Sequence, residues 1–181
     1  MRHEIIMSGF GGQGVLLMGQ ILTYAGMLEE KHVSWIPSYG PEMRGGTANC
    51  SVIITEGLPG SPMVEEPTAA VVLNLPSLDK FEAAVRENGV LIVNSSLIDK
   101  AVKRQDIKVY RVPVNDIAIE LGNLKMANMV ALGALIAATD AVEMEVLFTA
   151  FAKKFASKPQ VIEANNAAIN RGYDYVKKSL N

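Results

Sequence analysis

The sequence predicts an α/β fold: a single three-layer α/β/α domain with a mostly parallel or mixed sheet, a glycine-rich loop after strand 1 and a helical C-terminal region. Three observations lead to this prediction. Short apolar runs alternate with segments of helical periodicity from the first residues onward. Four glycines follow the first apolar run, within positions 9–14. Beyond residue 112 the periodicity is almost entirely helical.

The predicted strands are apolar runs, rich in Val and Ile, that are too short for helices. Several are almost wholly apolar, as expected for strands covered on both faces of a sheet. We expect strands at 3–8, 32–36, 48–55, 69–74, 90–94 and 107–112.

The predicted helices show apolar residues at three- and four-residue spacing. We expect them at 14–29, 77–87, 115–122, 125–139, 143–155 and 160–178. Lys125 and Asn128 open one of these helices. We expect Asn128 to hydrogen-bond a neighbouring loop and Gly133 to allow close approach of another element, and we interpret both as packing residues. Asn74 is expected to cap the helix that begins near Pro76, although it could instead line a cleft.

Length and composition fit one globular domain. The 181 residues are 49% hydrophobic, 20% charged and 6% aromatic, as is ordinary for a soluble α/β protein. No internal repeat, low-complexity tract or linker is visible, so we expect residues 1–181 to form a single domain. Only 37–46 and 57–67 break the alternation, and both are expected to be loops because of their Pro and Gly content.

The charge balance argues against two classes of partner. Seventeen basic and 19 acidic residues leave a formal net charge of −2, so neither a nucleic acid nor an anionic membrane surface is an expected partner. The longest uncharged apolar run, 126–139, is too short to span a bilayer. No cleavable apolar leader precedes the first strand, and we therefore expect a cytoplasmic protein.

Residues able to bind metals are scarce. Cys50 is the single cysteine, and one thiol can neither form an internal disulfide nor hold an iron–sulfur cluster. His3 and His32, the only histidines, are far apart in the sequence, so no metal site is expected. Cys50 has no histidine near it in sequence, and we interpret it as a small buried residue. No catalytic residue is predicted.

The glycine-rich loop has the features of a phosphate-binding turn. Gly9, Gly11 and Gly14 match G-x-G-x-x-G, with Gly12 and Gln13 between them, and the loop lies between a predicted strand and a predicted helix. Glycines permit positive φ and let a phosphate approach the backbone, while the first helical turn offers unpaired N–H donors. The same glycines could instead serve only a tight turn with close helix–sheet packing.

Two common nucleotide sites do not fit this loop. A nicotinamide site should carry Asp or Glu at the end of the second strand to hold ribose. That strand ends in the sequence WIPS, whereas Glu29 and Glu30 fall earlier, at the end of the helix. A Walker loop is excluded because no Lys-Ser or Lys-Thr follows the glycines. A stand-alone Rossmann-like nucleotide-binding protein remains an alternative.

The second distinctive loop is SYGPEMRGG, residues 38–46. It displays Tyr39, Glu42 and Arg44 among glycines and a proline, a composition suited to binding. Arg44 could bind a phosphate or carboxylate through two parallel hydrogen bonds, or it could pair with Glu42 within the loop.

GFGGQG at 9–14 followed by SYGPEMRGG at 38–46 resembles the gamma subunit of the 2-oxoacid:ferredoxin oxidoreductases, of the pyruvate, 2-oxoglutarate and 2-ketoisovalerate type. The likeness continues through PTAAVVLN at 67–74 and KMANMVALGAL at 125–135, so it covers most of the chain. The two loops are its most specific part.

The resemblance implies a complex that decarboxylates a 2-oxoacid on thiamine diphosphate, transfers the acyl group to coenzyme A and passes electrons to ferredoxin. Thiamine diphosphate and magnesium would be held by alpha and beta subunits, and iron–sulfur clusters by beta or a ferredoxin-like delta subunit. This chain would be inactive alone. Consistent with that division, its sequence has no G-D-G…N-N thiamine diphosphate signature.

In such a complex the gamma subunit is associated with the coenzyme A side of the active site. The resemblance therefore implies that the glycine loop cradles part of coenzyme A, while Arg44 contacts a phosphate or the neighbouring subunit. A purely structural subunit without ligand contact is the alternative. The expected ligand-contacting residues are Gly9, Gly11, Gly12, Gln13, Gly14, Tyr39 and Arg44.

Overall fold

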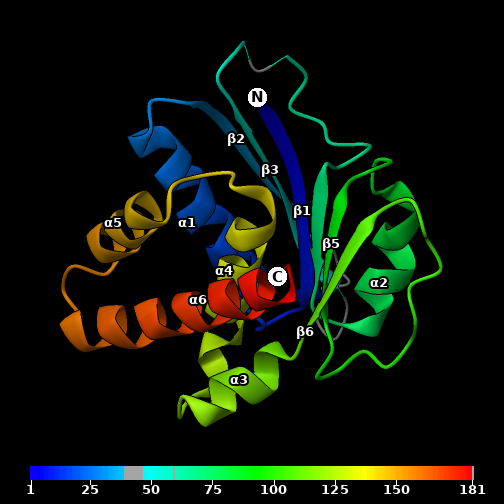
Figure 1. Cartoon of the computed structure of the whole chain (residues 1–181). Coiled ribbons are helices and arrows are strands. Elements are labelled where there is room, and N and C mark those ends of the chain that lie inside the picture. Colours follow the sequence, from blue (N-terminus) through cyan, green and yellow to red (C-terminus); the bar gives the residue numbers. More distant parts are fainter. Residues whose placement is uncertain (39–46, 59, 181) are drawn as a thin grey trace.

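The computed structural model describes residues 1–38, 47–58 and 60–180, which form a single α/β domain around one six-stranded sheet (Figure 1). The strand order is β2-β3-β1-β4-β5-β6. The strands are β1 (Arg2–Phe10), β2 (His32–Ser38), β3 (Thr47–Thr55), β4 (Ala69–Val72), β5 (Val90–Asn94) and β6 (Lys108–Val112).

The sheet is mixed. Strands β1, β4, β5 and β6 are parallel neighbours, whereas β3 runs antiparallel to both β1 and β2. Each of the six predicted strands is present. Predicted strand 69–74 stops at Val72, because Asn74 already caps the next helix.

The helices also follow the sequence prediction closely. They are α1 (Val15–Leu28), α2 (Leu75–Phe81), α3 (Val114–Glu120), α4 (Ala127–Thr139), α5 (Met144–Lys154) and α6 (Pro159–Ser179), with short 3₁₀ turns η2 (Glu82–Ala84) and η3 (Leu124–Met126). The helix predicted at 77–87 begins two residues earlier, and its second half is the 3₁₀ turn. Among the described residues, no helix is both long and apolar enough to cross a membrane.

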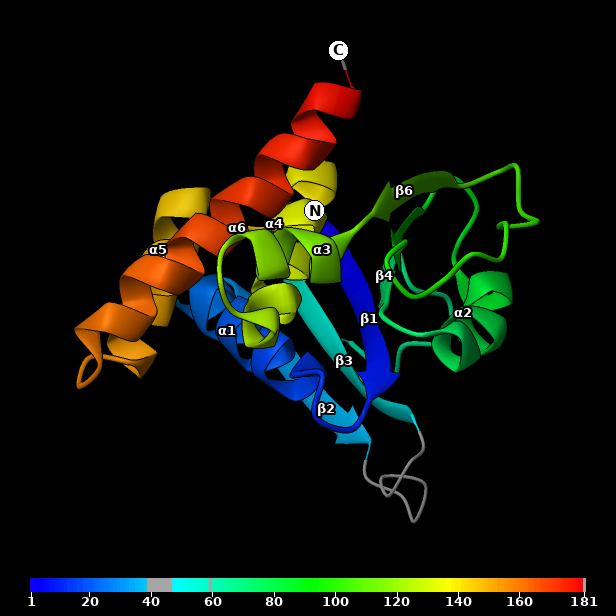
Figure 2. The same ribbon diagram turned by 90° about the horizontal axis from the view of Figure 1, so that it is seen from below.

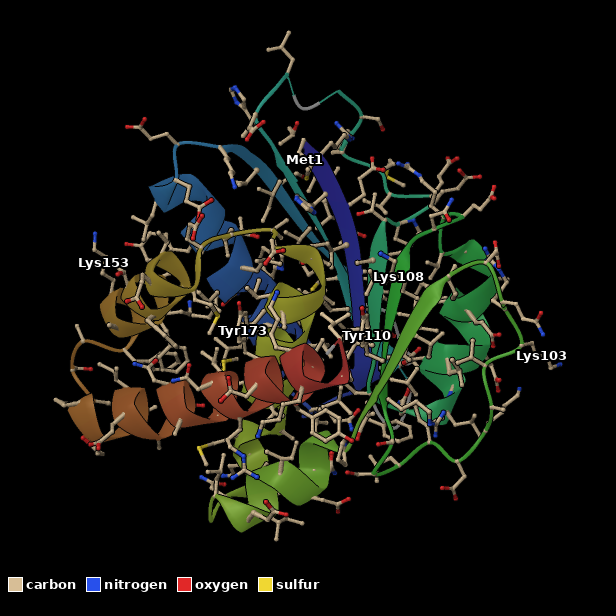
Figure 3. The ribbon with its side chains drawn as sticks, viewed as in Figure 1. Met1, Lys103, Lys108, Tyr110, Lys153 and Tyr173 are labelled. Atoms are coloured by element: carbon tan, nitrogen blue, oxygen red, sulfur yellow. The ribbon has the colours of Figure 1, made fainter. Side chains whose placement is uncertain are left out.

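The helices form layers of unequal thickness on the two faces of the sheet. Figure 1 shows α1, α4, α5 and α6 on one side and α2 on the other. The larger core lies under the four helices, where the half-buried Tyr110 of β6 and Tyr173 of α6 pack (Figure 3). A smaller core lies beneath α2 and includes Leu78 and Phe81. The predicted three-layer arrangement is confirmed.

The helices that follow β1 and β4 go to opposite faces of the sheet. Helix α1 joins the thick layer and α2 the thin one, although β1 and β4 are adjacent parallel strands. Such a divergence leaves a crevice beyond the carboxyl ends of the two strands, the place where open α/β sheets bind ligands. The glycine loop follows β1 at this edge and can be seen between β1 and α1 in the lower part of Figure 2.

Asn74 fixes the start of α2. Its side-chain Oδ1 accepts a hydrogen bond from the Ser77 backbone N–H at 2.9 Å, and Pro76 occupies the first turn. Beneath it, the buried hydroxyls of Ser8 and Ser77 are hydrogen-bonded at 2.7 Å, which joins β1 to α2. The predicted capping role of Asn74 is confirmed.

Helices α4 and α6 cross at two glycines. A Cβ atom on Gly133 would overlap the carbonyl oxygen of Ile169, and one on Gly172 would overlap that of Val130. Close approach at Gly133 is therefore confirmed. It brings α6 onto α4, which is buried along most of its length and explains the uniform apolarity of its sequence.

We predict that Gly133→Ala destabilises the fold by about 1–3 kcal/mol, because the added methyl meets backbone rather than a side chain that can rotate away. Urea unfolding followed by circular dichroism measures this loss. Gly57→Ala is the control, since the nearest atom to its added methyl is Thr55 Oγ1 at 3.9 Å. Equal stability of the two variants would contradict the tight crossing.

Candidate functional site

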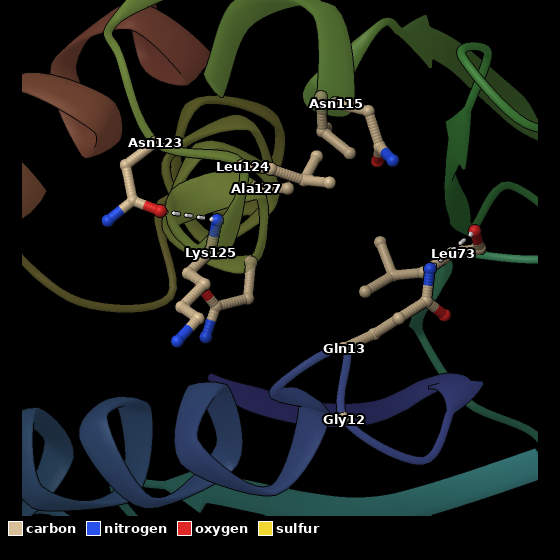
Figure 4. A pocket seen from close by; sticks show the side chains of 10 residues that line it. Gly12, Gln13, Leu73, Asn115, Asn123, Leu124, Lys125 and Ala127 are labelled. Atoms are coloured by element: carbon tan, nitrogen blue, oxygen red, sulfur yellow. Dashed lines mark hydrogen bonds between the residues drawn. The ribbon is translucent and has the colours of Figure 1, made fainter. Parts of the chain in front are cut away.

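A cavity of about 480 Å³ lies at the carboxyl edge of the sheet, beyond the ends of β1 and β4 (Figure 4). Its walls come from four segments that are far apart in sequence: the glycine loop, the end of β4, the start of α3, and η3 with the start of α4. The lining residues are Gly12, Gln13, Leu73, Val114, Asn115, Asn123, Leu124, Lys125, Ala127 and Asn128.

Gly12 and Gly14 both have backbone conformations that favour glycine. Their φ angles are 92° and 78°, in the left-handed region. Gly12 has no other atom within 4 Å of the position of a Cβ, so it opens onto free space at the cavity. Gly14 is the N-cap of α1, and a Cβ there would overlap the side chain of Asn128.

The other two glycines of the motif do not line the cavity. A Cβ on Gly9 would lie 2.5 Å from Gln13 Oε1 and 3.1 Å from Leu73 Cβ, so Gly9 is required for packing. Gly11 is exposed in the turn. Of the glycines predicted to bind a ligand, Gly12 is therefore the one that the structure places in the cavity wall.

Gln13 lines the cavity but uses its amide to hold the loop in shape. Its Oε1 accepts from the Phe10 backbone N–H at 2.6 Å, and its Nε2 donates to the Leu73 carbonyl at 3.4 Å. The Gln13 N–H in turn donates to the Phe10 carbonyl at 3.1 Å. The side chain thus connects the glycine loop to the end of β4.

The Leu73 carbonyl is shared by a second amide. Asn94, fully buried at the end of β5, donates from Nδ2 to this carbonyl at 3.1 Å and to Asn115 Oδ1 at 2.9 Å. On the other side, Asn128 Nδ2 donates to the Gly14 carbonyl at 3.3 Å, so the predicted contact of Asn128 with a loop is confirmed. Hydrogen bonds therefore connect all four cavity walls.

The first turn of α1 supplies hydrogen-bond donors beside the loop. The first intrahelical bond after the cap runs from the Met18 N–H to the Gly14 carbonyl at 3.1 Å. The N–H groups of the preceding helical residues have no acceptor within the helix, and they carry the positive end of its dipole. A phosphate or carboxylate group fits this arrangement.

Among the described residues that line the cavity, the charge is positive: Lys125 is the one charged side chain, and none of them carries a carboxylate. Glu29, at the C-cap of α1, forms an ion pair with Lys31 at 2.5 Å and accepts from the Glu143 N–H at 2.6 Å. The described residues therefore agree with the sequence argument against a nicotinamide site.

The topology explains why that acid is missing. In a nicotinamide-binding unit the strand that follows the first helix is parallel to β1 and adjacent to it. Here β2 lies two positions away, and the antiparallel β3 separates it from β1. The end of β2 consequently lies outside the crevice between β1 and β4.

Tyr39 and Arg44 lie outside the described residues, and their predicted roles stay predictions. The strand ends that flank their loop are described. Ser38 ends β2 and Thr47 begins β3, and Thr47 pairs with Phe10 at the end of β1. The loop is therefore attached to the same edge of the sheet as the cavity.

Four polar residues that line the cavity were not predicted to do so: Asn115, Asn123, Lys125 and Asn128. They lie more than a hundred residues beyond the glycine loop, in segments that the sequence marks only as helix starts. Their polar character at such starts was the available signal.

Cys50 is not a reactive group in this fold. It is fully buried in β3, and its thiol donates to the Val15 carbonyl at 3.5 Å. Burial raises the pKa of the Cys50 thiol to about 12. The interpretation as a small buried residue is confirmed.

Together these features define an α/β domain with an anion-compatible cavity at the divergence point of its sheet. Residues 4–175 match the family model described as pyruvate ferredoxin/flavodoxin oxidoreductase. The chain belongs to this family, as the resemblance of its two loops indicated.

The chain is similar in sequence to two named oxidoreductase subunits. The chain is 38% identical to the ketoisovalerate oxidoreductase subunit VorA of Methanothermobacter marburgensis over 98% of its own length, but it spans only 37% of that relative. It is 37% identical to the 2-oxoglutarate synthase subunit KorC of Methanocaldococcus jannaschii, covering 98% of this chain and 96% of that one.

Solved structures agree on the fold. The keto/oxoacid ferredoxin oxidoreductase gamma subunit from Geobacter sulfurreducens matches with a TM-score of 0.84 and 32% identity, over 97% of this chain and 99% of that one. The 2-oxoglutarate:ferredoxin oxidoreductase from Magnetococcus marinus has a TM-score of 0.86 at 20% identity. That match covers 98% of this chain and 31% of the other.

We predict that Asn94→Ala lowers the free energy of unfolding by about 1–3 kcal/mol, because it removes two buried hydrogen bonds and leaves their acceptors less satisfied. Chemical denaturation measures the change. Asn170→Ala, at an exposed position on α6, is the control and should lie close to the parent. A comparable loss in both variants would show that the Asn94 hydrogen bonds do not stabilise the fold.

We also predict that Cys50 resists alkylation at mildly alkaline pH in the native protein and reacts readily after unfolding in urea. The raised pKa keeps the native thiol protonated, whereas in the unfolded chain the thiol ionises at its usual, lower pKa. The resulting contribution to stability is present below the unfolded pKa and declines as the pH rises above it. Mass spectrometry after a timed iodoacetamide pulse measures the difference, and rapid native labelling would contradict it.

Proposed function

We propose that the chain is a non-autonomous subunit of a complex that oxidatively decarboxylates a 2-oxoacid to acyl-coenzyme A with ferredoxin as electron acceptor. Its part is to help bind coenzyme A and to pack against the other subunits. The observation that carries this proposal is the cavity between β1 and β4, which combines a glycine loop and a helix start and whose described lining residues include one cation and no carboxylate. The proposal includes the predicted cytoplasmic location.

The chemistry of coenzyme A supports the choice of ligand. Its nucleotide end carries a pyrophosphate and a 3′-phosphate, which need N–H donors and cations rather than an acid that reads ribose. The cavity offers donors of that kind. The Magnetococcus marinus enzyme, which shares the fold, was solved with 2-oxoglutarate, coenzyme A and succinyl-CoA bound.

The edge around the cavity also suits a protein partner. Large apolar side chains are exposed at this edge: Phe10, which ends β1, is 41% exposed, and Leu75 and Leu97, which follow β4 and β5, are 42% and 48% exposed. Leu124 in the cavity lining is 51% exposed. Apolar side chains grouped around a site commonly mark an interface. Coenzyme A would then bind where this subunit meets its partners.

The proposed partners are alpha and beta subunits, a ferredoxin-like delta subunit, and ferredoxin itself through the complex. Thiamine diphosphate, magnesium and the iron–sulfur clusters are assigned to those partners. Within the described part of the chain, no three His, Cys, Asp or Glu residues are grouped so that they could hold a metal ion. The relatives that the chain matches along almost their whole length are themselves named as subunits.

Each residue predicted to contact coenzyme A receives a place in this proposal. Gly12 forms the open wall, while Gly9, Gly11, Gln13 and Gly14 give the loop its shape. Tyr39 and Arg44 are proposed to contact a phosphate or the adjoining subunit from the neighbouring loop.

We predict that Gly12→Val raises the KM for coenzyme A in the assembled complex by about tenfold, because a β-branched side chain at positive φ moves the loop and fills the space that it faces. Steady-state assays with the 2-oxoacid and ferredoxin measure this. The KM for the 2-oxoacid should stay at the parental value.

Gly60→Val is the matched control, since Gly60 also has positive φ, 60°, but lies in the loop between β3 and β4. It should leave the KM for coenzyme A unchanged. If Gly12→Val assembles normally and binds coenzyme A like the parent, the glycine loop has no ligand role, and a purely structural subunit is the better description.

A further inference from the structure

Among the described residues, Lys125 is the one charged side chain that lines either of two adjoining hollows. The first is the 480 Å³ cavity. The second, of about 370 Å³, has apolar walls that include Leu17, Phe151 and Phe155, and it shares Asn123, Lys125 and Asn128 with the first. The ammonium group is therefore attached where two otherwise uncharged hollows meet.

The position of Lys125 is fixed by its backbone. Asn123 Oδ1 accepts from the Lys125 N–H at 3.0 Å, and the Asn123 carbonyl accepts from the Met126 N–H at 3.0 Å, which starts η3. Three residues further on, Asn128 is bonded to the Gly14 carbonyl. The segment that carries Lys125 is thus tied directly to the start of α1.

The side chain itself is available. The Lys125 ammonium makes no hydrogen bond or ion pair with any described residue. In Figure 4 its side chain extends from η3 toward α1, the helix that the glycine loop begins. Solubility alone would not require this lysine to be held in a fixed position beside the first turn of α1.

We propose that Lys125 binds a phosphate group of the ligand from the wall opposite Gly12, so that one phosphate is held between the lysine ammonium and the N–H groups of the glycine loop and α1. This inference rests on the proposed function, because it assumes that the cavity receives coenzyme A. The lysine attracts the phosphate through its charge, and the N–H donors of the loop fix the orientation in which the phosphate binds.

The neutral amides around Lys125 strengthen its effect. Asn115 and Asn128 supply polar groups without charge, and no carboxylate among the described lining residues of either hollow competes for the ammonium. Of the described side chains, an anion entering the cavity therefore meets one positive charge and no negative one. Ligands that carry no phosphate should be indifferent to it.

The test is Lys125→Gln in the assembled complex, assayed with two competitors of coenzyme A, each of which reproduces a different chemical part of that ligand. Adenosine 3′,5′-bisphosphate carries phosphates and no thiol, whereas pantetheine carries the thiol and no phosphate. We expect the inhibition constant of the bisphosphate to rise by about tenfold to a hundredfold, the usual effect of losing a hydrogen bond to a charged group. The inhibition constant of pantetheine should not change.

Two further variants control for structure. Lys125→Arg keeps the charge and should restore most of the affinity for the bisphosphate. Lys153→Gln removes an exposed lysine from the last turn of α5 (labelled in Figure 3) that lines neither hollow, and should leave both constants at the parental values.

The outcomes separate this inference from the proposed function. Unchanged bisphosphate inhibition in Lys125→Gln, while Gly12→Val still weakens coenzyme A binding, would overturn the role of Lys125 and leave the function intact. An equal rise in the inhibition constants of both competitors would also overturn it, because a lysine that binds only phosphate cannot affect the binding of pantetheine, which has none. No effect from either Lys125→Gln or Gly12→Val would overturn both proposals.

Discussion

The backbone carbonyl of Leu73 is the junction on which the candidate site depends. It accepts from Gln13 of the glycine loop and from Asn94 of β5, and Asn94 also binds Asn115 of α3. The Leu73 N–H donates to the Ser8 carbonyl at 2.9 Å and continues the pairing of β1 with β4. Because this residue lies where the helices leave for opposite faces, its hydrogen bonds join the segments that form the cavity walls.

This construction gives the cavity a simple chemical character. Amides that are occupied within the protein make its walls rigid, and the remaining attractive groups are a helix start and one lysine. Such a site favours anions and does not by itself perform chemistry. That matches a subunit that positions a substrate for cofactors held by other chains of a complex. The glycine motif lies at the strand-to-helix turn where a Rossmann site binds phosphate, and the described lining of the cavity contains no acid that could read ribose.

The sequence predicted the elements well because each one buries a recognisable pattern. Short Val- and Ile-rich runs became strands, and Asn74 before Pro76 and Ser77 became a helix cap. The antiparallel pairing of β3 with β1 and β2 could not be predicted, because a strand has the same apolar pattern whichever direction it runs. The glycine loop shows a subtler limit. Its motif fits phosphate binding, yet Gly9 and Gly14 are explained by contacts with Gln13, Leu73 and Asn128 that only the fold reveals.

The cavity's polar wall was beyond sequence reasoning for a different reason. Lys125 and Asn115 come near Gly12 through the sheet order and the hydrogen bonds of Asn94 and Asn128, and no local pattern encodes that convergence. Family resemblance supplied a ligand class but not these residues. The loop that contains Tyr39 and Arg44 remains a prediction from sequence, attached to the edge of the sheet where the cavity lies.

The most direct measurement is an anaerobic cryo-electron microscopy map of the assembled complex with coenzyme A bound. The account predicts density for a coenzyme A phosphate between Gly12 and Lys125, beside the first turn of α1. Coenzyme A bound entirely within other subunits, with the cavity filled by partner side chains, would contradict it.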